Sequence, residues 1–233
     1  MVISQRFVVV AALFITCLIT ANIIAVKLIT LGIGPVRLGG LELPAPLPAA
    51  IIIFPLSYII GDILTEVYGY RQARRVIWLG FLCNVIAVIA LWVAGQLPAL
   101  DRDVQVAYER IFNYVPRILV ASFAAYLVGE FANSFVLAKM KIRTKGRFLW
   151  TRTIGSTIVG QGLDASVFIA IAFGGTKPGA LIGGIILTHW LVKTGYEAVA
   201  TPFTYAVVNY LKRKEGIDTY DYDTDFNPLL VTR

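Results

Sequence analysis

The stretch FPLSYIIGDILTEVYGYRQARR, residues 54–75, joins an apolar segment that suits a lipid environment to a basic cluster. Two carboxylates, Asp62 and Glu66, lie between these parts, four residues apart. Four residues make roughly one helical turn, so both acids lie on one face of a helix. An ionisable group at membrane depth costs about 2.5–3.5 kcal/mol on insertion scales, so it normally faces a cavity or a partner. The stretch therefore predicts a membrane helix whose acidic face has a function or a binding partner.

The composition of the whole chain supports this interpretation. Hydrophobic residues make up 58% of the 233 residues and charged residues 15%, with a mean hydropathy of +0.74, whereas soluble domains carry about 25% charged residues. The sequence predicts an all-α polytopic membrane protein, with one transmembrane domain over residues 1–211 and a cytoplasmic polar tail over residues 212–233. We expect the acidic part of this tail, EGIDTYDYDTDFNPLLVTR (215–233), to be loosely ordered. We expect six transmembrane helices, at residues 7–29, 48–67, 76–95, 117–139, 148–173 and 179–211.

The distribution of Lys and Arg predicts the orientation of these helices. Thirteen of these cations fall near the termini and in the loops after the second and fourth spans, and five fall on the opposite side. Because cations collect on the cytoplasmic side, we expect both termini in the cytoplasm. The net charge of +7 then reflects membrane topology and gives no reason to expect nucleic acid as a partner. The mixed-charge loop 97–116 predicts a short surface helix on the outer side.

Polar residues inside the predicted spans are the candidates for function. They share helix faces at i, i+3 or i, i+4 spacing: Glu130 with Asn133, Arg152 with Ser156, Gln161 with Asp164, and His189 with Lys193 and Glu197. So many polar groups in six helices predict a hydrated cavity for a small polar ligand. We predict the substrate-binding residues Glu130, Asn133, Gln161, Asp164, Arg152 and Asn84, and the gating or coupling residues Asp62, Glu66, Lys193 and Glu197.

Structural alternatives exist for several of these residues. Asp62 and Glu66 could pair with the basic residues of the cluster that follows them, which are Arg71, Arg74 and Arg75. The stripe on the sixth span could be an internal Lys193–Glu197 ion pair with a neutral His189, or a proton relay. The asparagines could bond neighbouring helices, and for Gly155, Gly160 and Gly162 we favour close helix packing.

Several kinds of chemistry are absent from the sequence. GGTKPG, residues 174–179, has the wrong spacing for a phosphate-binding loop, and there is no HExxH or GxSxG motif. Cys17 and Cys83 form no metal-ligand pair, and the chain has one histidine. We therefore expect neither an enzyme nor a bound metal or cofactor.

Three long motifs carry a family resemblance. FPLSYIIGDILTEVYGYRQARRVIWLGF (54–81), GEFANSFVLAKMK (129–141) and TKGRFLWTRTIGSTIVGQGLDASVFIAIAFGG (144–175) closely resemble the queuosine precursor transporters, also called the vitamin uptake transporter family. The resemblance implies an inner-membrane importer of 7-cyano-7-deazaguanine, its aminomethyl relative or queuine, for tRNA modification. It also implies a distant likeness to the six-helix substrate-binding subunits of energy-coupling-factor transporters, with which the small pair Ala21 and Ala25 agrees weakly.

The chemistry of a deazaguanine suits the predicted site. A carboxylate accepts from both N1–H and the exocyclic amine, while Gln, Asn or Arg donates to O6. Phe54, Tyr58 or Trp190 could stack on the ring. A binding subunit that needs an energising partner, and a membrane enzyme or structural bundle, are the alternative functions. The sequence leaves open which deazapurine is preferred, whether transport is coupled to an ion, and whether the chain forms a homo-oligomer.

Overall fold

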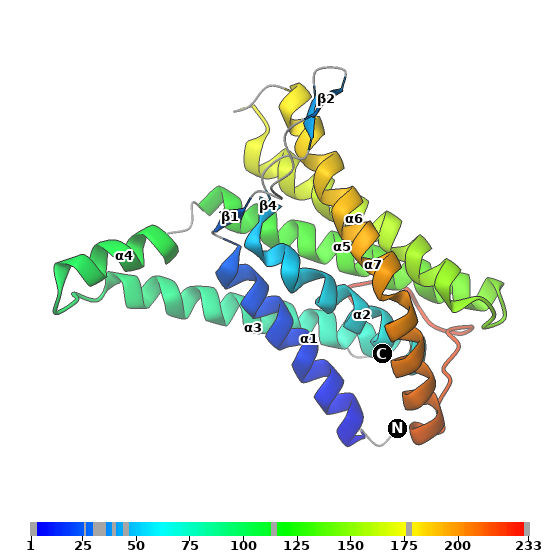
Figure 1. Cartoon of the computed structure of the whole chain (residues 1–233). Helices are drawn as coiled ribbons and strands as arrows, with labels where there is room; N and C mark the ends of the chain where they lie inside the picture. The colour runs from blue at the N-terminus through cyan, green and yellow to red at the C-terminus, as the bar shows by residue number, and fades with distance from the viewer. Residues whose placement is uncertain are drawn as a thin grey trace.

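The computed structural model describes residues 4–25, 27–29, 36–38, 41–43, 47–112, 116–175 and 179–230, and within them the chain is mainly helical (Figure 1). In chain order the elements are α1 (Gln5–Ile24), β1 (Leu28–Ile29), β2 (Val36–Leu38), β3 (Leu41–Leu43), β4 (Leu47–Pro48), the 3-10 helix η1 (Ala49–Ile52), α2 (Phe54–Tyr68), α3 (Tyr70–Gln96), α4 (Arg102–Phe112), α5 (Pro116–Arg143), α6 (Leu149–Phe173) and α7 (Gly179–Glu215).

The bundle has two distinct ends. At one end α1 begins and α7 finishes, and Arg6 Nη1 lies 3.3 Å from Glu215 Oε1; we call this the terminal end. At the other, the strand end, β1 pairs antiparallel with β4 between α1 and α2, and β2 pairs antiparallel with β3. Both chain termini lie together in Figure 1, away from these strands. The α-helical prediction is confirmed, although the short strands were not predicted.

Turn residues divide the helices where the sequence allows unusual backbone angles. Gly69 has a φ of 84° and separates α2 from α3, because few residues other than glycine adopt such an angle without strain. The turn between α5 and α6 likewise has positive φ at Lys145, Gly146 and Phe148. The helices so separated pack against one another, and the acidic face of α2 contacts Asn133 on α5, Arg152 on α6 and Lys212 on α7.

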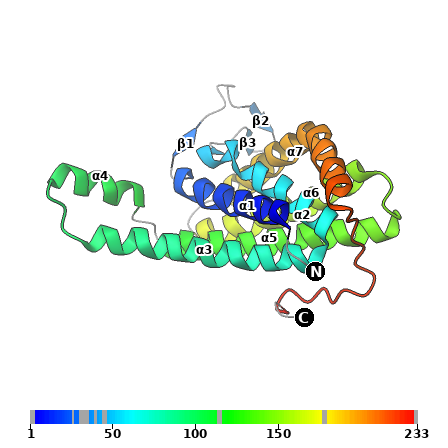
Figure 2. The same ribbon diagram turned by 90° about the horizontal axis from the view of Figure 1, so that it is seen from below.

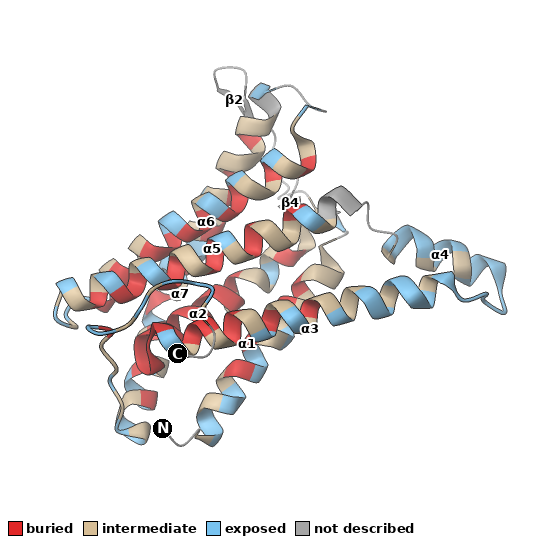
Figure 3. Ribbon diagram, turned by 180° about the vertical axis from the view of Figure 1, so that it is seen from behind, coloured by how far each residue is buried: buried red, intermediate tan, exposed pale blue. Residues whose placement is uncertain are grey.

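The outer surface of the bundle is apolar, as expected for contact with lipid. Large apolar side chains such as Val9, Leu82, Ile86 and Trp92 are about half exposed, while buried residues line the inward faces of the helices (Figure 3). In the part of the chain described, four helices are long and apolar enough to cross a membrane: α1, α3, α5 from Leu119 to Arg143, and α6. The protein is therefore a multi-pass membrane protein.

Two of the six predicted spans do not meet that criterion. The helix α2 has 15 residues, which at about 1.5 Å per residue is shorter than the roughly 30 Å hydrocarbon core. The helix α7 has 37 residues and carries His189, Lys193 and Glu197 in its length. Polar groups that face the interior thus reduce the apolar character of the helices that bear them.

The loop after α3 forms the predicted surface helix. This helix, α4, has no buried residue, and it folds back along the C-terminal end of α3, where Tyr108 Oη donates to the carbonyl of Leu91 at 2.9 Å. Figure 2 shows the α3–α4 hairpin extending beyond the other helices.

The expectation of a loosely ordered tail is wrong for residues 216–230. Arg74 Nη1 donates to the carbonyls of Asp225 at 2.8 Å and Asn227 at 2.6 Å. Trp78 Nε1 donates to the carbonyl of Pro228 at 2.8 Å. Polar composition suggested disorder, but these donors on α3 satisfy the backbone of the tail and fix it across the terminal end.

Candidate functional site

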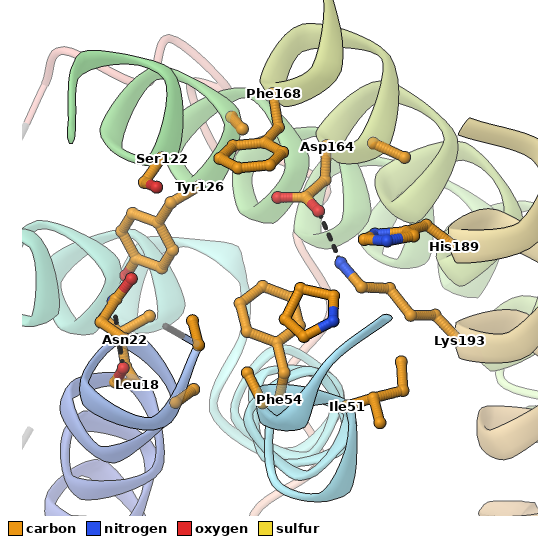
Figure 4. A pocket seen from close by; sticks show the side chains of 16 residues that line it. Leu18, Asn22, Ile51, Phe54, Ser122, Tyr126, Asp164, Phe168, His189 and Lys193 are labelled. Carbon is orange, nitrogen blue, oxygen red and sulfur yellow. Dashed lines mark hydrogen bonds and ion pairs between the residues drawn. The ribbon is translucent and has the colours of Figure 1, made fainter. Parts of the chain in front are cut away.

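A cavity lies toward the strand end of the bundle, between α1, η1, α2, α5, α6 and α7 (Figure 4). Its volume is about 100 Å³. By the same measure a single water molecule needs roughly 10–15 Å³, so the cavity has room for several water molecules or a small ligand. The lining is largely apolar, with a few polar groups at one side, which is typical of small-molecule sites. The lining residues are Leu18, Ala21, Asn22, Ala25, Pro48, Ala50, Ile51, Phe54, Ser122, Ala125, Tyr126, Asp164, Ala165, Phe168, His189 and Lys193.

The polar side of the cavity is built around one ion pair. Lys193 Nζ on α7 donates to Asp164 Oδ2 on α6 at 2.8 Å, and both side chains are about nine-tenths buried. Lys193 Nζ also lies 4.1 Å from the centre of the Phe54 ring. Figure 4 shows Phe54 and Phe168 on opposite sides of the cavity, with the carboxylate of Asp164 near them. A planar polar molecule would find flat apolar faces and, at its edge, both an acceptor and a donor.

A second group of polar residues lies deeper in the bundle, and we call Asp62, Glu130, Asn133 and Glu197 the central cluster. All four are buried, and they come from α2, α5 and α7. Asn133 Nδ2 donates to Asp62 Oδ1 at 2.7 Å. Glu130 interacts electrostatically with Glu197 and with Asp164, which connects the central cluster to the cavity.

Close contact between α5 and α6 positions the central cluster beside Asp164. A Cβ atom on Gly160 would lie 2.7 Å from Asn133 Cβ, and one on Gly129 would lie 2.8 Å from Asp164 Cβ. Real Cβ atoms do not approach so closely, so glycine is required at both positions. The predicted packing role of Gly160 is confirmed: Gly160 faces Asn133 across the contact between α5 and α6, and Gly129 faces Asp164, so the two polar residues lie at neighbouring turns of this contact.

Glu66 lies one turn beyond Asp62 and has a different environment, in a group that we call the ion-pair network (Glu66, Lys141, Arg152, Lys212 and Asp218). Arg152 binds both oxygens of Glu66, at 2.7 and 2.8 Å, and Lys212 Nζ donates to Glu66 Oε1 at 2.6 Å. Lys141 Nζ donates to the Glu66 carbonyl at 2.5 Å. The network joins α2, α5, α6 and α7 at the terminal end.

The tail completes the ion-pair network. Asp218 Oδ1 accepts from Lys141 at 2.7 Å and lies 2.8 Å from Lys212 Nζ. Partial burial by itself would raise the pKa of Asp218, but the hydrogen bonds and charges of Lys141 and Lys212 outweigh it and hold the pKa below its usual range. The tail therefore contributes a carboxylate to the closure of this end.

The structure separates the predicted site residues into these three groups. Asp164 and Lys193 line the cavity, Asp62, Glu130, Asn133 and Glu197 form the central cluster, and Glu66 and Arg152 belong to the ion-pair network. Gln161 is buried on the same helix as Asp164, and its Oε1 has no hydrogen-bond partner among the described residues. Asn84 is buried on α3, a helix that contributes no residue to the cavity lining.

Two structural alternatives are corrected by these contacts. The partners of Glu66 come from α5, α6 and α7, whereas Arg74 of the neighbouring basic cluster bonds the tail. Lys193 forms its ion pair with Asp164 on another helix, in place of the Glu197 one turn away on its own helix. In both cases partners far apart in the sequence replace local ones.

Sequence reasoning missed Phe168 and Tyr126 as cavity residues. Phe168 follows Asp164 by four residues and Tyr126 precedes Glu130 by four, so helical spacing places each on the face of a candidate acid. That spacing was the available signal. Among the proposed aromatic residues, Phe54 lines the cavity, whereas Trp190 Nε1 donates to the carbonyl of Ile158 at 2.9 Å.

Comparison with known proteins identifies a family for the chain. Residues 48–207 match the family model described as "Putative vitamin uptake transporter". The chain is similar to a "Probable queuosine precursor transporter" of Bacillus subtilis (strain 168), with 29% identity over 70% of this chain and 72% of the relative. It is 27% identical to the "Queuosine precursor transporter" of Escherichia coli (strain K12), over 59% of this chain and 58% of the relative.

A third relative, a "Probable queuosine precursor transporter" of Haemophilus influenzae, is 27% identical over 52% of this chain and 50% of its own length. No solved structure matches the chain, so the likeness to energy-coupling-factor subunits stays a prediction. The family model covers well over half of the chain, including α2, α3, α5, α6 and most of α7. The chain belongs to the vitamin uptake transporter family and is a membrane transporter, not an enzyme.

Proposed function

We propose that this transporter imports a queuosine precursor, a planar 7-deazaguanine base, across the bacterial inner membrane. The observation that carries the proposal is the cavity in which the Asp164–Lys193 ion pair lies beside the rings of Phe54 and Phe168. The printed names of three relatives support this class of substrate. The candidate ligands are 7-cyano-7-deazaguanine, its aminomethyl relative and queuine.

The polar edge of such a base complements the ion pair. The Asp164 carboxylate accepts hydrogen bonds from N1–H and the exocyclic amine, while the Lys193 ammonium donates to O6. Phe54 and Phe168 hold the ring from its two faces. Glu130, Asn133 and Gln161 form the deeper part of the site, and Arg152 acts in the ion-pair network, away from the ligand.

The proposed topology has six crossings with both termini in the cytoplasm. The helix α2 together with η1 extends from Ala49 to Tyr68, and twenty residues at about 1.5 Å each reach roughly 30 Å. The Lys and Arg residues at the start of α3 and the end of α5 lie at the terminal end, where the tail contacts both helices. This end therefore faces the cytoplasm, and the cavity faces the outside.

Transport then requires alternating access to one site. The cavity receives the base from the strand end while the ion-pair network and the tail close the terminal end. Release into the cytoplasm requires Glu66, Arg152 and Lys212 to separate. Asp62 and Glu66, one turn apart on α2, connect the central cluster to this gate.

The test uses a bacterium that lacks its own deazaguanine synthesis and its own importer. The chain is expressed, nanomolar 7-cyano-7-deazaguanine or queuine is supplied, and queuosine in tRNA is quantified by mass spectrometry. We expect queuosine with the wild type and with Asp103→Asn, an exposed position on α4. Asp164→Asn should abolish it at equal protein in the membrane. No queuosine with either base, despite protein confirmed in the membrane, would refute the substrate assignment.

A second assay separates a self-sufficient transporter from a subunit that needs an energising partner. Liposomes that contain only this chain should take up the labelled base and exchange it with unlabelled base inside. Binding without uptake or exchange would indicate a binding subunit. Conversion of the base would indicate an enzyme.

A further inference from the structure

Three buried carboxylates of the central cluster have almost no hydrogen-bond partners. Asp62, Glu130 and Glu197 are at most 1% exposed. Asn133 donates to Asp62 Oδ1. Within the described part of the chain, Asp62 Oδ2 and both oxygens of Glu130 and of Glu197 have no hydrogen-bond partner. A buried polar atom without a partner costs free energy, so five such oxygens in one place require an explanation.

The neighbouring polar groups do not supply the missing partners. The hydroxyl of Tyr58 is fully buried, has no hydrogen-bond partner among the described residues, and interacts electrostatically with Asp62, Glu130 and Asp164. This donor lies among the acids, so the feature combines a buried donor with buried acceptors and is more than a row of acids. Gln161 Oε1 on α6 is also buried and has no hydrogen-bond partner among the described residues.

The charges around the three acids do not balance if all of them are ionised. The ionisable groups that interact with them are Tyr58 and Glu66 on α2, Tyr126 on α5, Asp164 on α6 and Lys193 on α7. Lys193 is bonded to Asp164, and Glu66 is bonded to Arg152 and Lys212. No described cation thus forms an ion pair with Asp62, Glu130 or Glu197. Three uncompensated carboxylates in a membrane interior are too costly to persist, whereas protonated carboxyl groups are neutral and can donate.

We propose that Asp62, Glu130 and Glu197 form a proton-binding site that couples substrate import to the inward movement of protons. This inference rests on the proposed transport function. A carboxylate takes up a proton from water on the side of the cavity and releases it to water at the terminal end, so the protein returns to its starting charge after each cycle. The class of ligand is the proton.

Asp164 provides the link between substrate and proton. It lines the cavity and also interacts electrostatically with Glu130. When the substrate engages Asp164 and Lys193, the field at Glu130 changes, and with it the affinity for the proton. By reciprocity, protonation of the central cluster changes the affinity for the substrate by the same factor.

The geometry favours a proton over a metal cation. No group of three or more His, Cys, Asp or Glu residues in the described ranges is arranged to hold a metal ion. Sodium is the competing coupling ion, and it is an outcome of the test. A proton needs one carboxylate oxygen and a neighbouring acceptor, which the central cluster supplies.

The experiment uses purified full-length protein in liposomes that contain a pH-sensitive dye, with 7-cyano-7-deazaguanine as the probe. We expect the interior to acidify in step with uptake. An inside-alkaline gradient of about one pH unit should raise accumulation by up to about tenfold for each coupled proton. The sodium gradient is varied separately at constant pH.

Substitutions localise the effect. In Glu130→Gln and Glu197→Gln the ratio of uptake with the gradient to uptake without it should fall to unity, while Asp103→Asn keeps the wild-type ratio. An independent readout is the infrared carbonyl stretch of a protonated carboxyl group, measured at neutral pH on the detergent-solubilised protein. It should be present in the wild type and reduced in each of the two Gln variants.

Each other outcome has a distinct meaning. Uptake that is equal with and without a pH gradient, with no dye response, overturns the proton proposal and leaves the transport proposal standing. Uptake driven by sodium alone, or the absence of the infrared band from the wild type, also overturns it. Failure of the transport proposal itself looks different, because neither uptake nor exchange of the base occurs under any gradient.

Discussion

The substitution Glu66→Gln should destabilise the protein strongly, because Glu66 is the centre of the ion-pair network. Its side chain is 0% exposed, and the Arg152 side chain that binds both its oxygens is 2% exposed. Removal of one partner from a buried pair costs about 3–5 kcal/mol, because the other charge stays buried without compensation. Lys212 and Lys141 retain Asp218 as a partner, so Arg152 carries most of this cost.

Thermal unfolding in mild detergent measures this effect. With about 2–4 °C per kcal/mol for a chain of this size, the expected decrease in Tm is about 6–20 °C. A double variant, Glu66→Gln with Arg152→Gln, should recover part of the loss because it leaves no unpaired guanidinium. Glu109→Gln, at an exposed position of α4, should change stability by less than about 0.5 kcal/mol. A Glu66→Gln protein that unfolds at the wild-type temperature would refute the assignment of this network as the closure of the terminal end.

Three further predictions concern packing, the tail and pH. Gly160→Ala would place a methyl group 2.7 Å from Asn133 Cβ and should cost about 1–3 kcal/mol of stability. The control Gly195→Ala, with nothing within 4 Å of the added Cβ, should be tolerated. Thermal unfolding of the two variants measures the difference. Deletion of residues 217–233 should lower Tm and speed proteolysis, because the tail bonds several helices; unchanged values would count against a structural tail. Asp218 has a lowered pKa, so its stabilisation is complete above its ordinary pKa of about 3.9 and is lost as the pH falls through the lowered value. The difference in Tm between wild type and Asp218→Asn should accordingly be constant from neutral pH to about 5 and disappear at lower pH.

Much of the fold follows from the sequence because apolar runs and turn residues are local signals. The predicted spans 117–139, 148–173 and 179–211 correspond to α5, α6 and α7 within a few residues. The first span was expected to continue to residue 29, but α1 ends at Ile24 and the chain enters the strand pairs. Backbone pairing between β1 and β4 joins segments about twenty residues apart, and no local pattern indicates it.

The candidate site was harder to predict from the sequence than the fold. Helical spacing shows which residues share one face of a helix, but it does not show which residue of another helix that face contacts. The spacing of Arg152 and Ser156 indicated a polar face, and the substrate was the natural partner to assign. In the structure Arg152 forms an ion pair with Glu66, which is 86 residues away in the sequence. The order of the tail was predicted wrongly for a related reason. Its acidic composition reflects only its side chains, whereas its backbone carbonyls make many of its contacts with α3.

The two acids of α2 now have different explanations, although they lie one turn apart on one helix. Glu66 has three cations around it and a carboxylate from the tail beyond them, so its charge is compensated and it holds helices together. Asp62 accepts a hydrogen bond from the amide of Asn133 and interacts with the three acids Glu130, Glu197 and Glu66, and among the described residues no cation is bonded to it. A movement of α2 shifts both acids together, because a helix is rigid over one turn. Under the proposed mechanism, loss of a proton from the central cluster places like charges around Asp62 and strains α2 against α5 and α7. The same movement pulls Glu66 away from Arg152, so proton release and opening of the terminal end occur in one step.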